Sequence, residues 1–341
     1  MMTDIAHAWK KVITCAARRC GLRGNKMKYV FGVDIGGTTV KLGLFDENGE
    51  LLEKWEIPTD KTDKGKNIVG DVCDSIKNKI SERSIATADV IGVGVGAPGA
   101  VDEDGVMTGG AVNLGWDVFN LRTTMEEKLD GIRVVAGNDA NVAAYGEMLK
   151  GGGKGHKNVV AVTLGTGVGG GVIIGGKLIT GATGAAGEIG HIRVADGEEE
   201  KCNCGHTGCL EQYASATGIA RLARRRLAKD DKATSLRNVE NLDAKAVFDA
   251  VKAGDEVAIE IAEEFGSYLG KGLASVADVV NPEIFVIGGG VSKAGEILLS
   301  FVAPEFVKYV FPPCKGAQFA LATLGNDAGI YGCAGMLLSD I

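Results

Sequence analysis

Three cysteines and a nearby histidine are the residues of this chain with the clearest chemistry. Cys202, Cys204 and Cys209 fall within CNCGHTGC, and His191 ends the segment GEIGH, eleven residues before the first cysteine. Three thiolates and one imidazole form the donor set of a tetrahedral structural zinc site. We therefore predict that these four residues bind Zn²⁺ and that the ion fixes a loop carrying polar side chains.

Two alternatives stay open for this cysteine segment. His206 lies between the cysteines and is a rival fourth ligand, although the fourth donor of such sites usually comes from a separate chain segment. The C-x-C-x₄-C spacing also departs from the commonest C-x₂-C pattern. Ordinary reduced surface thiols are therefore the competing interpretation.

Three glycine turns are suited to a nucleotide. DIGGTTVK (34–41) joins an acidic strand end to a turn with exposed N–H groups, which suits phosphate oxygens with Mg²⁺ nearby. LGTGVGGG (164–171) is a second such turn, and GGGVSKAG (288–295) lies between a buried strand and a helix, where a nucleotide's sugar and base would bind. Such turns also close plain hairpins. Because neither a P-loop nor a dinucleotide G-x-G-x-x-G follows the first strand, the turns indicate a different ATP-binding architecture.

A carboxylate lies where the segment RVVAGND ends and the helical segment ANVAAYGEML begins. This place suits a helix cap and equally a catalytic group. Phosphoryl transfer to a hydroxyl needs an acidic side chain that accepts the departing proton, and Asp139 is the candidate. Asn113, in AVNLGW, is a candidate for hydrogen bonds to vicinal hydroxyls, whereas Trp116 in the same segment is predicted to belong to the core.

The elements that must position these residues form a pattern that occurs twice. NVVAVTLGTG leads into VGGGVIIGG much as FGVDIGGT leads into VKLGLFD, each a hairpin with a glycine and threonine turn. Two similar α/β halves facing a cleft would gather all the turns around one ligand. The predicted strands are 29–37, 39–46, 51–57, 90–99, 132–136, 158–167, 168–176, 284–290 and 319–324, and the predicted helices are 64–83, 121–129, 140–149, 215–229, 255–280, 292–309 and a terminal helix from 327.

Composition narrows the class of protein. A chain of 341 residues with 45% hydrophobic content is expected to form two domains, and a net charge of −7 disfavours nucleic acid or an anionic membrane as partner. The uncharged run 159–176 has the length of a membrane span, but its seven glycines favour two short strands. The remaining five cysteines are scattered, which favours a reducing, cytoplasmic compartment. Residues 1–26 resemble a basic amphipathic leader without a signal-peptide core, and residues 1–28 are predicted to be a dispensable extension.

Taken together, these motifs resemble those of the ROK family of sugar kinases and repressors. The motifs are DIGGTTVK, GAPGAV, NLGW, GNDAN, LGTGVGGG, GEIGH, CNCGHTGCLEQYASATG and VIGGGVS, and the match runs from Tyr29 to the C-terminus. The resemblance implies two actin-like, ribonuclease-H-like α/β domains with an intervening cleft, and a homodimer. It also implies phosphorylation of glucose at its 6-hydroxyl by ATP. The expected domains are 29–137 with 327–341, and 138–326.

The resemblance assigns a role to each matching residue. Asp139 would be the general base, Asp34 would lie near Mg²⁺, and His191 would use one ring nitrogen for zinc and the other for the sugar. The other sugar ligands would be Asn113, Asn138, Glu188 and Glu211. The phosphates would be surrounded by Gly36, Gly37, Thr38, Lys41, Gly165, Thr166 and Gly167, and the adenosine would be approached by Gly289 and Gly290.

Alternatives within and outside this function remain. A ROK repressor would carry a winged helix-turn-helix before the sugar domain, and the 28 residues before Tyr29 are too few for one. A non-catalytic sugar-binding protein would not need a carboxylate at Asp139 beside the glycine turns. Fructose, mannose or an N-acetylhexosamine could replace glucose as substrate, and polyphosphate could replace ATP as donor.

Overall fold

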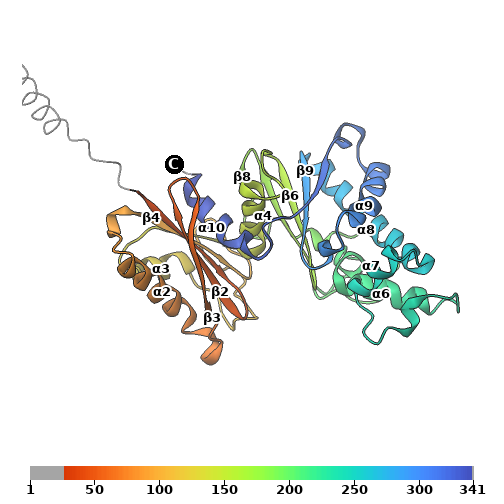
Figure 1. The fold of residues 1–341 in the computed structure, drawn as a ribbon, viewed down its shortest axis with the longest axis horizontal. Coiled ribbons are helices and arrows are strands. Elements are labelled where there is room, and N and C mark those ends of the chain that lie inside the picture. The colour runs from red at the N-terminus through yellow and green to blue at the C-terminus, as the bar shows by residue number, and fades with distance from the viewer. Residues whose placement is uncertain (1–26, 340–341) are drawn as a thin grey trace, which may run out of the picture.

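Two five-stranded sheets with the same topology form the framework of the computed structural model, which describes residues 27–339 (Figure 1). The strand orders are β3-β2-β1-β4-β5 and β8-β7-β6-β9-β10, and in each sheet an antiparallel three-strand meander continues into two parallel strands. The predicted duplication of an α/β unit is therefore confirmed. The strands are β1 (Tyr29–Ile35), β2 (Thr39–Asp46), β3 (Leu51–Pro58), β4 (Val90–Ala97), β5 (Val134–Asn138), β6 (Val159–Leu164), β7 (Val168–Ile174), β8 (Lys177–Leu178), β9 (Ile284–Gly288) and β10 (Gln318–Leu321).

The helices agree with the predicted ones except at four places, one of which is the short helix α5, where no helix was predicted. The helix expected from residue 64 begins at Ile68, after a 3₁₀ turn in which Asp63 and Lys64 have positive φ. The helix expected from 292 is interrupted at Gly295, and α7 was not predicted at all. The helices are α2 (Ile68–Glu82), α3 (Leu121–Lys128), α4 (Asp139–Lys150), α5 (Glu211–Ala214), α6 (Ala216–Leu227), α7 (Ala244–Lys252), α8 (Glu256–Val280), α9 (Glu296–Tyr309) and α10 (Ala328–Leu338).

Each sheet has one face covered by its own helices and the other by a helix that lies between the sheets. Alternate residues of β1 point to opposite faces, so Phe31 and Val33 pack in the core with α2 and α3, whereas Val30 packs with α10. In the second sheet, Val160 and Val162 face a core shared with helices α6 to α9, and Val159 faces α4. Helices α4 and α10 lie side by side between the sheets (Figure 1).

Helices α4 and α10 meet backbone to backbone. Gly146 and Gly332 lie at this crossing, and a Cβ at Gly332 would overlap the carbonyl oxygen of Val142. Next to the crossing, the buried carboxylate of Glu147 accepts hydrogen bonds from the backbone N–H groups of Gly152 (2.9 Å), Thr323 (3.1 Å) and Leu324 (2.9 Å). Glu147 thus attaches the segment leading into α10 to the end of α4.

Two further sequence predictions concern the chain's ends and the long uncharged run. Residues 159–176 form the β6–β7 hairpin, as predicted, and no helix between residues 27 and 339 is long and apolar enough to cross a membrane. The basic leader predicted for residues 1–26 lies outside the described residues.

Candidate functional site

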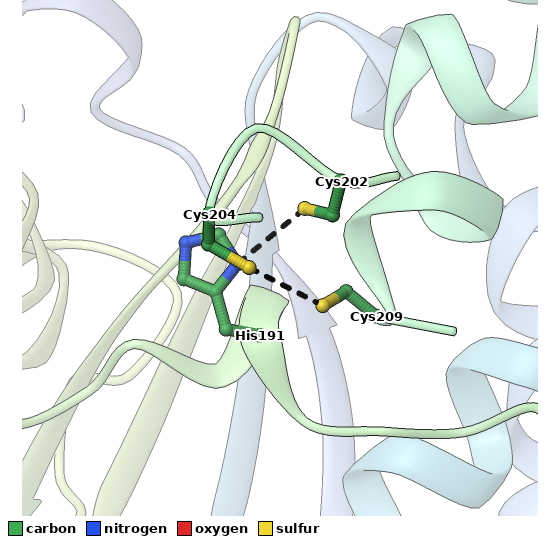
Figure 2. A group of neighbouring side chains, drawn as sticks. All are labelled: His191, Cys202, Cys204 and Cys209. Carbon is green, nitrogen blue, oxygen red and sulfur yellow. Dashed lines mark hydrogen bonds between the residues drawn. The ribbon is translucent and has the colours of Figure 1, made fainter. Parts of the chain in front are cut away.

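The three cysteines and His191 converge (Figure 2). Their four ligand atoms all lie within 4.8 Å of one another, with Sγ of Cys204 3.6 Å from Sγ of Cys209, and Sγ of Cys202 3.7 Å from Nδ1 of His191. A tetrahedral zinc ion would separate two sulfur ligands by about 3.8 Å and a sulfur from a nitrogen by about 3.6 Å. The donor set and its spacing therefore fit zinc. His206, the rival ligand, is not part of this group.

Backbone hydrogen bonds give the cysteine loop, residues 200–209, its shape. Cys202 donates its backbone N–H to the carbonyl of His206 at 2.7 Å, and Gly205 donates to the carbonyl of Cys202 at 2.8 Å. The segment that carries His191 is held nearby, because Leu210 donates to the carbonyl of Ile192 at 2.8 Å. Two separate segments thus bring the imidazole and the thiols together.

Asp139 lies in the first turn of α4 and is not the residue that caps the helix. The cap is Asn138, whose Oδ1 accepts the N–H of Asn141 at 3.0 Å. The Oδ1 of Asp139 accepts hydrogen bonds from Ala140 N (2.8 Å) and Asn138 Nδ2 (3.1 Å). Burial raises the pKa of Asp139, the hydrogen bonds oppose this, and the Glu188 carboxylate adds to the rise. Asp139 is therefore a half-buried carboxylate with raised proton affinity.

Asp34 is a second half-buried carboxylate at the same edge of the first sheet. It lies near the end of β1, and β1, β4 and β5 are parallel, so their carboxyl ends meet near Asp139. Burial raises the pKa of Asp34 to about 6, with Lys41 lowering it and Asp139 raising it. No group in residues 27–339 donates a hydrogen bond to this carboxylate. A half-buried carboxylate without donors suits a cation such as Mg²⁺.

The predicted sugar-binding side chains form a continuous series of neighbours that starts at Asp139. Glu188 influences Asp139 electrostatically, and its Oε2 lies 3.9 Å from Nε2 of His191. The thiol of Cys202, next to His191, lies 3.7 Å from Oε1 of Glu211. The other Glu211 oxygen accepts the N–H of Val168, the first residue of β7, at 3.0 Å.

Two other predicted residues lie close to this series. Asn138 is adjacent to Asp139 and donates its Nδ2 to the carbonyl of Gly99 at 3.0 Å. Asn113 lies beside the glycine turn of the first sheet, where a Cβ built on Gly37 would be 3.9 Å from its Nδ2. Its neighbour Trp116 is buried and donates to the carbonyl of Gly65, as expected of a core residue.

The β6–β7 turn is tied to the start of α6. Ala216 donates its N–H to the carbonyl of Gly165 at 2.8 Å, and the hydroxyl of Thr217 donates to the carbonyl of Thr166 at 2.8 Å. The ASATG segment, 214–218, thus positions the turn that contains Gly165, Thr166 and Gly167. Sequence reasoning did not assign this task to Thr217, although a serine and a threonine at a helix start are a visible capping signal.

A pocket of about 280 Å³ lies beside the third glycine turn. Gly289 has a φ of 85° and passes so close to the Leu164 backbone that a side chain would not fit. The pocket next to it was not predicted, because much of its wall comes from α7. Its lining residues are Ala216, Asp243, Ala244, Lys245, Phe248, Asp249, Lys252, Gly290, Val291, Lys293 and Ala294.

Comparison with known proteins agrees with these features. The model of the ROK family matches residues 30–340. The chain belongs to the ROK family. A glucokinase of Halalkalibacterium halodurans is 45% identical over 89% of this chain and 93% of its own length, and one of Thermotoga maritima is 37% identical over 92% and 98%.

Solved ROK structures share the fold. A ROK family glucokinase from Streptomyces griseus in complex with glucose and AMPPNP is 36% identical, covers 90% of this chain and 98% of its own, and superimposes with a TM-score of 0.69. The ROK hexokinase from Thermus thermophilus is 30% identical, with a TM-score of 0.76 over 92% of this chain and 100% of its own. The predicted fold of two actin-like α/β domains is confirmed by this likeness and by the repeated sheet topology.

Proposed function

We propose that the chain transfers the γ-phosphoryl group of ATP to the 6-hydroxyl of glucose, giving glucose 6-phosphate and ADP. One observation carries the proposal: the half-buried carboxylate of Asp139 has Asp34 as one electrostatic neighbour and Glu188, next to His191 of the cysteine site, as another. The similarity to glucokinases over nine-tenths of the chain supports glucose as the substrate.

Asp139 is the proposed general base. The sugar's 6-hydroxyl gives its proton to the Asp139 carboxylate while its oxygen attacks the γ-phosphorus, and the bond from that phosphorus to the bridging oxygen of ADP breaks. The raised pKa of Asp139 makes its carboxylate a stronger proton acceptor than an exposed aspartate. The hydrogen bonds from Ala140 and Asn138 hold Oδ1 in place.

The remaining sugar hydroxyls are proposed to bind the side chains around Asp139. Carboxylates accept hydrogen bonds from hydroxyls, and the side-chain amides can donate and accept, so this mixture suits a polyhydroxylated ring. The exposure of Glu188 and His191 leaves both side chains accessible to a ligand. The proposed sugar ligands are Asn113, Asn138, Asp139, Glu188, His191 and Glu211.

The nucleotide is proposed to bind across the three glycine turns. Gly36, Gly37, Thr38 and Lys41 would surround the phosphates together with Gly165, Thr166 and Gly167. The N–H of Gly36 closes the turn on the carbonyl of Thr39 at 3.1 Å, so Gly37 and Thr38 would offer their N–H groups. The adenosine would lie by Gly289 and Gly290, where the pocket beside α7 offers Phe248 as an apolar surface. Mg²⁺ would be held near Asp34 and would neutralise phosphate charge when bound.

Zinc is proposed as a structural ion in the cysteine loop, held by His191, Cys202, Cys204 and Cys209. Its contribution is to keep this loop ordered, so that the free ring nitrogen of His191 faces the sugar. The thiols require reducing conditions, and the six cysteines of the described part are free, which is in keeping with a cytoplasmic protein.

Residues 29–137 with 327–341, and residues 138–326, are the proposed domains that close over the substrates. The packing of α10 on the first sheet and of α4 on the second supports this division. Closure would exclude water, which is a competing phosphoryl acceptor. A homodimer is the proposed assembly.

A panel of hexoses tests the proposed function. ADP release is measured with ATP and each of glucose, fructose, mannose and N-acetylhexosamines, and with polyphosphate replacing ATP. We expect the highest kcat/KM for glucose with ATP. If another sugar gave a higher kcat/KM, that sugar would replace glucose as the proposed substrate. If no hexose gave ADP release, the kinase proposal would be refuted.

A further inference from the structure

Gln212 joins the two ends of the cysteine loop. Its side-chain Oε1 accepts the N–H of Gly208 at 2.8 Å and the N–H of Cys209 at 3.1 Å, and its Nε2 donates to the carbonyl of Glu200 at 2.8 Å. Gln212 is only 9% exposed, so these bonds compete little with water. One side chain thus satisfies three backbone groups that flank the thiols.

Gln212 and its neighbour Glu211 serve different parts of the site. Glu211 contacts Cys202 and the start of β7 at Val168, whereas the side-chain bonds of Gln212 all go to the backbone of the loop. None of the Gln212 bonds involves a metal ligand atom. The loop ends therefore have a connection that does not depend on the ion.

A second layer holds Gln212 itself. Arg221 of α6 donates its Nη1 to the backbone carbonyl of Gln212 at 3.1 Å and its Nε to the carboxylate of Glu200 at 2.6 Å. Arg221 also pairs with the buried Glu198, which accepts the hydroxyl of Tyr213 at 2.6 Å. Both ends of the loop are therefore attached to α6, whose start is tied to the β6–β7 turn.

We propose that Gln212 is a positioning residue that shapes the cysteine loop before zinc binds and, through that loop, fixes His191 toward the sugar. The expected effect of Gln212 on metal affinity rests on the proposed zinc site. The order of the loop backbone does not rest on zinc in the same way, because none of the three hydrogen bonds uses an atom that would bind the ion. Partners hydrogen-bonded directly to metal-binding side chains typically change metal affinity by about 10- to 100-fold, and we expect the low end of that range for Gln212 because it bonds to the backbone of the loop.

The test uses two substitutions of Gln212 and one matched control in the full-length protein. Gln212→Glu keeps an oxygen that can accept the N–H groups of Gly208 and Cys209. It also places a second oxygen against the carbonyl of Glu200, where two acceptors repel and the bond to Glu200 is lost. Gln212→Ala removes all three bonds. Asn203→Ala is the control, because Asn203 is exposed in the same loop and its side chain makes no hydrogen bond within residues 27–339.

Three quantities are measured: competition for zinc against a chromogenic chelator, amide hydrogen exchange over 200–210 in zinc-free protein, and KM for glucose against kcat. We expect both Gln212 variants to lose zinc affinity by about 10-fold and to raise KM more than they lower kcat, and we expect Gln212→Ala to exchange the amides of Gly208 and Cys209 faster than wild type and Gln212→Glu. Asn203→Ala should match wild type in all three.

The outcomes separate this inference from the zinc proposal. If wild-type protein binds no zinc, the zinc proposal fails, and faster amide exchange with a raised KM in Gln212→Ala still supports the positioning role. If both Gln212 variants fold with wild-type thermal stability and retain wild-type amide exchange and KM, the inference is overturned.

Discussion

Nδ1 of His191 lies 3.7 Å from Sγ of Cys202, while the other nitrogen of the same ring lies 3.9 Å from a carboxylate oxygen of Glu188. The imidazole of His191 thus lies between the cysteine thiols and Glu188, the carboxylate that influences Asp139 electrostatically. Zinc bound at Nδ1 would leave the ring proton on Nε2, the nitrogen that lies toward Glu188. We infer that the thiols control how the sugar is held and do not take part in the phosphoryl transfer itself.

The two histidines near the thiols give a matched pair of variants. We expect His191→Gln to lower zinc affinity and to raise KM for glucose by about 10-fold or more, because the substitution removes a proposed metal ligand and a proposed sugar contact. His206→Gln should retain one zinc per chain and a wild-type KM, because His206 is not in the ligand group. Metal analysis after dialysis against a chelator, with glucose kinetics, checks both. If His206→Gln lost zinc and His191→Gln kept it, His206 would be the fourth ligand in place of His191.

Asp34 should make the metal-free protein less stable as the pH rises. Its pKa is raised mainly by burial from 3.8 to about 6, so the folded state binds the proton more tightly than the unfolded state. The stability contributed by this proton is complete below about pH 4 and is lost as the pH rises through about 6. Asp34→Asn should therefore stabilise the metal-free protein at pH 8 by about 1 to 3 kcal/mol, while abolishing activity.

Asp255 provides a control of opposite sign. Burial alone would raise its pKa, but hydrogen bonds from Ser235 and Thr234 lower it to about 2. Asp255→Asn should therefore lose stability at neutral pH, and the loss should shrink as the pH falls from about 4 to about 2. Urea unfolding at several pH values measures both variants. An Asp34→Asn protein that is less stable than wild type at pH 8 would contradict the burial argument.

The helix crossing between the two sheets should tolerate no side chain at Gly332. A Cβ there would overlap the Val142 carbonyl, so Gly332→Ala must separate α10 from α4, and we expect a loss of about 3 kcal/mol or more. Gly70, inside α2, has open space around it, and Gly70→Ala should stabilise by up to about 1 kcal/mol through helix propensity. Denaturant unfolding compares the two, and similar effects in both would show that the crossing is not tightly packed.

Local features of the fold could be predicted because each has a signal within a few residues. The β1–β2 and β6–β7 hairpins follow from apolar runs on either side of a glycine and threonine turn. Helix α7 also had a signal, because Asp243 caps it and Val247, Phe248 and Val251 share a face, yet it was not predicted. That omission concealed one wall of the pocket beside Gly290.

Contacts between distant segments could not be predicted in the same way. The approach of Asp34 to Asp139 depends on β4 pairing with both β1 and β5, and no local pattern specifies that order. The sequence left His191 and His206 as rival candidates for the fourth zinc ligand, and the fold places His191 beside the thiols. Gln212 had no signal at all, because its role comes from the backbone groups that the folded loop presents to it.

Asp139 carries the central claim, and one substitution tests it. Asp139→Asn removes the base with little change of shape, so glucose binding measured by calorimetry should persist. The decisive measurement is kcat for ADP release by this variant at saturating glucose and MgATP. We expect kcat to fall by about 10²- to 10⁴-fold; a kcat close to that of the wild-type protein would contradict the account.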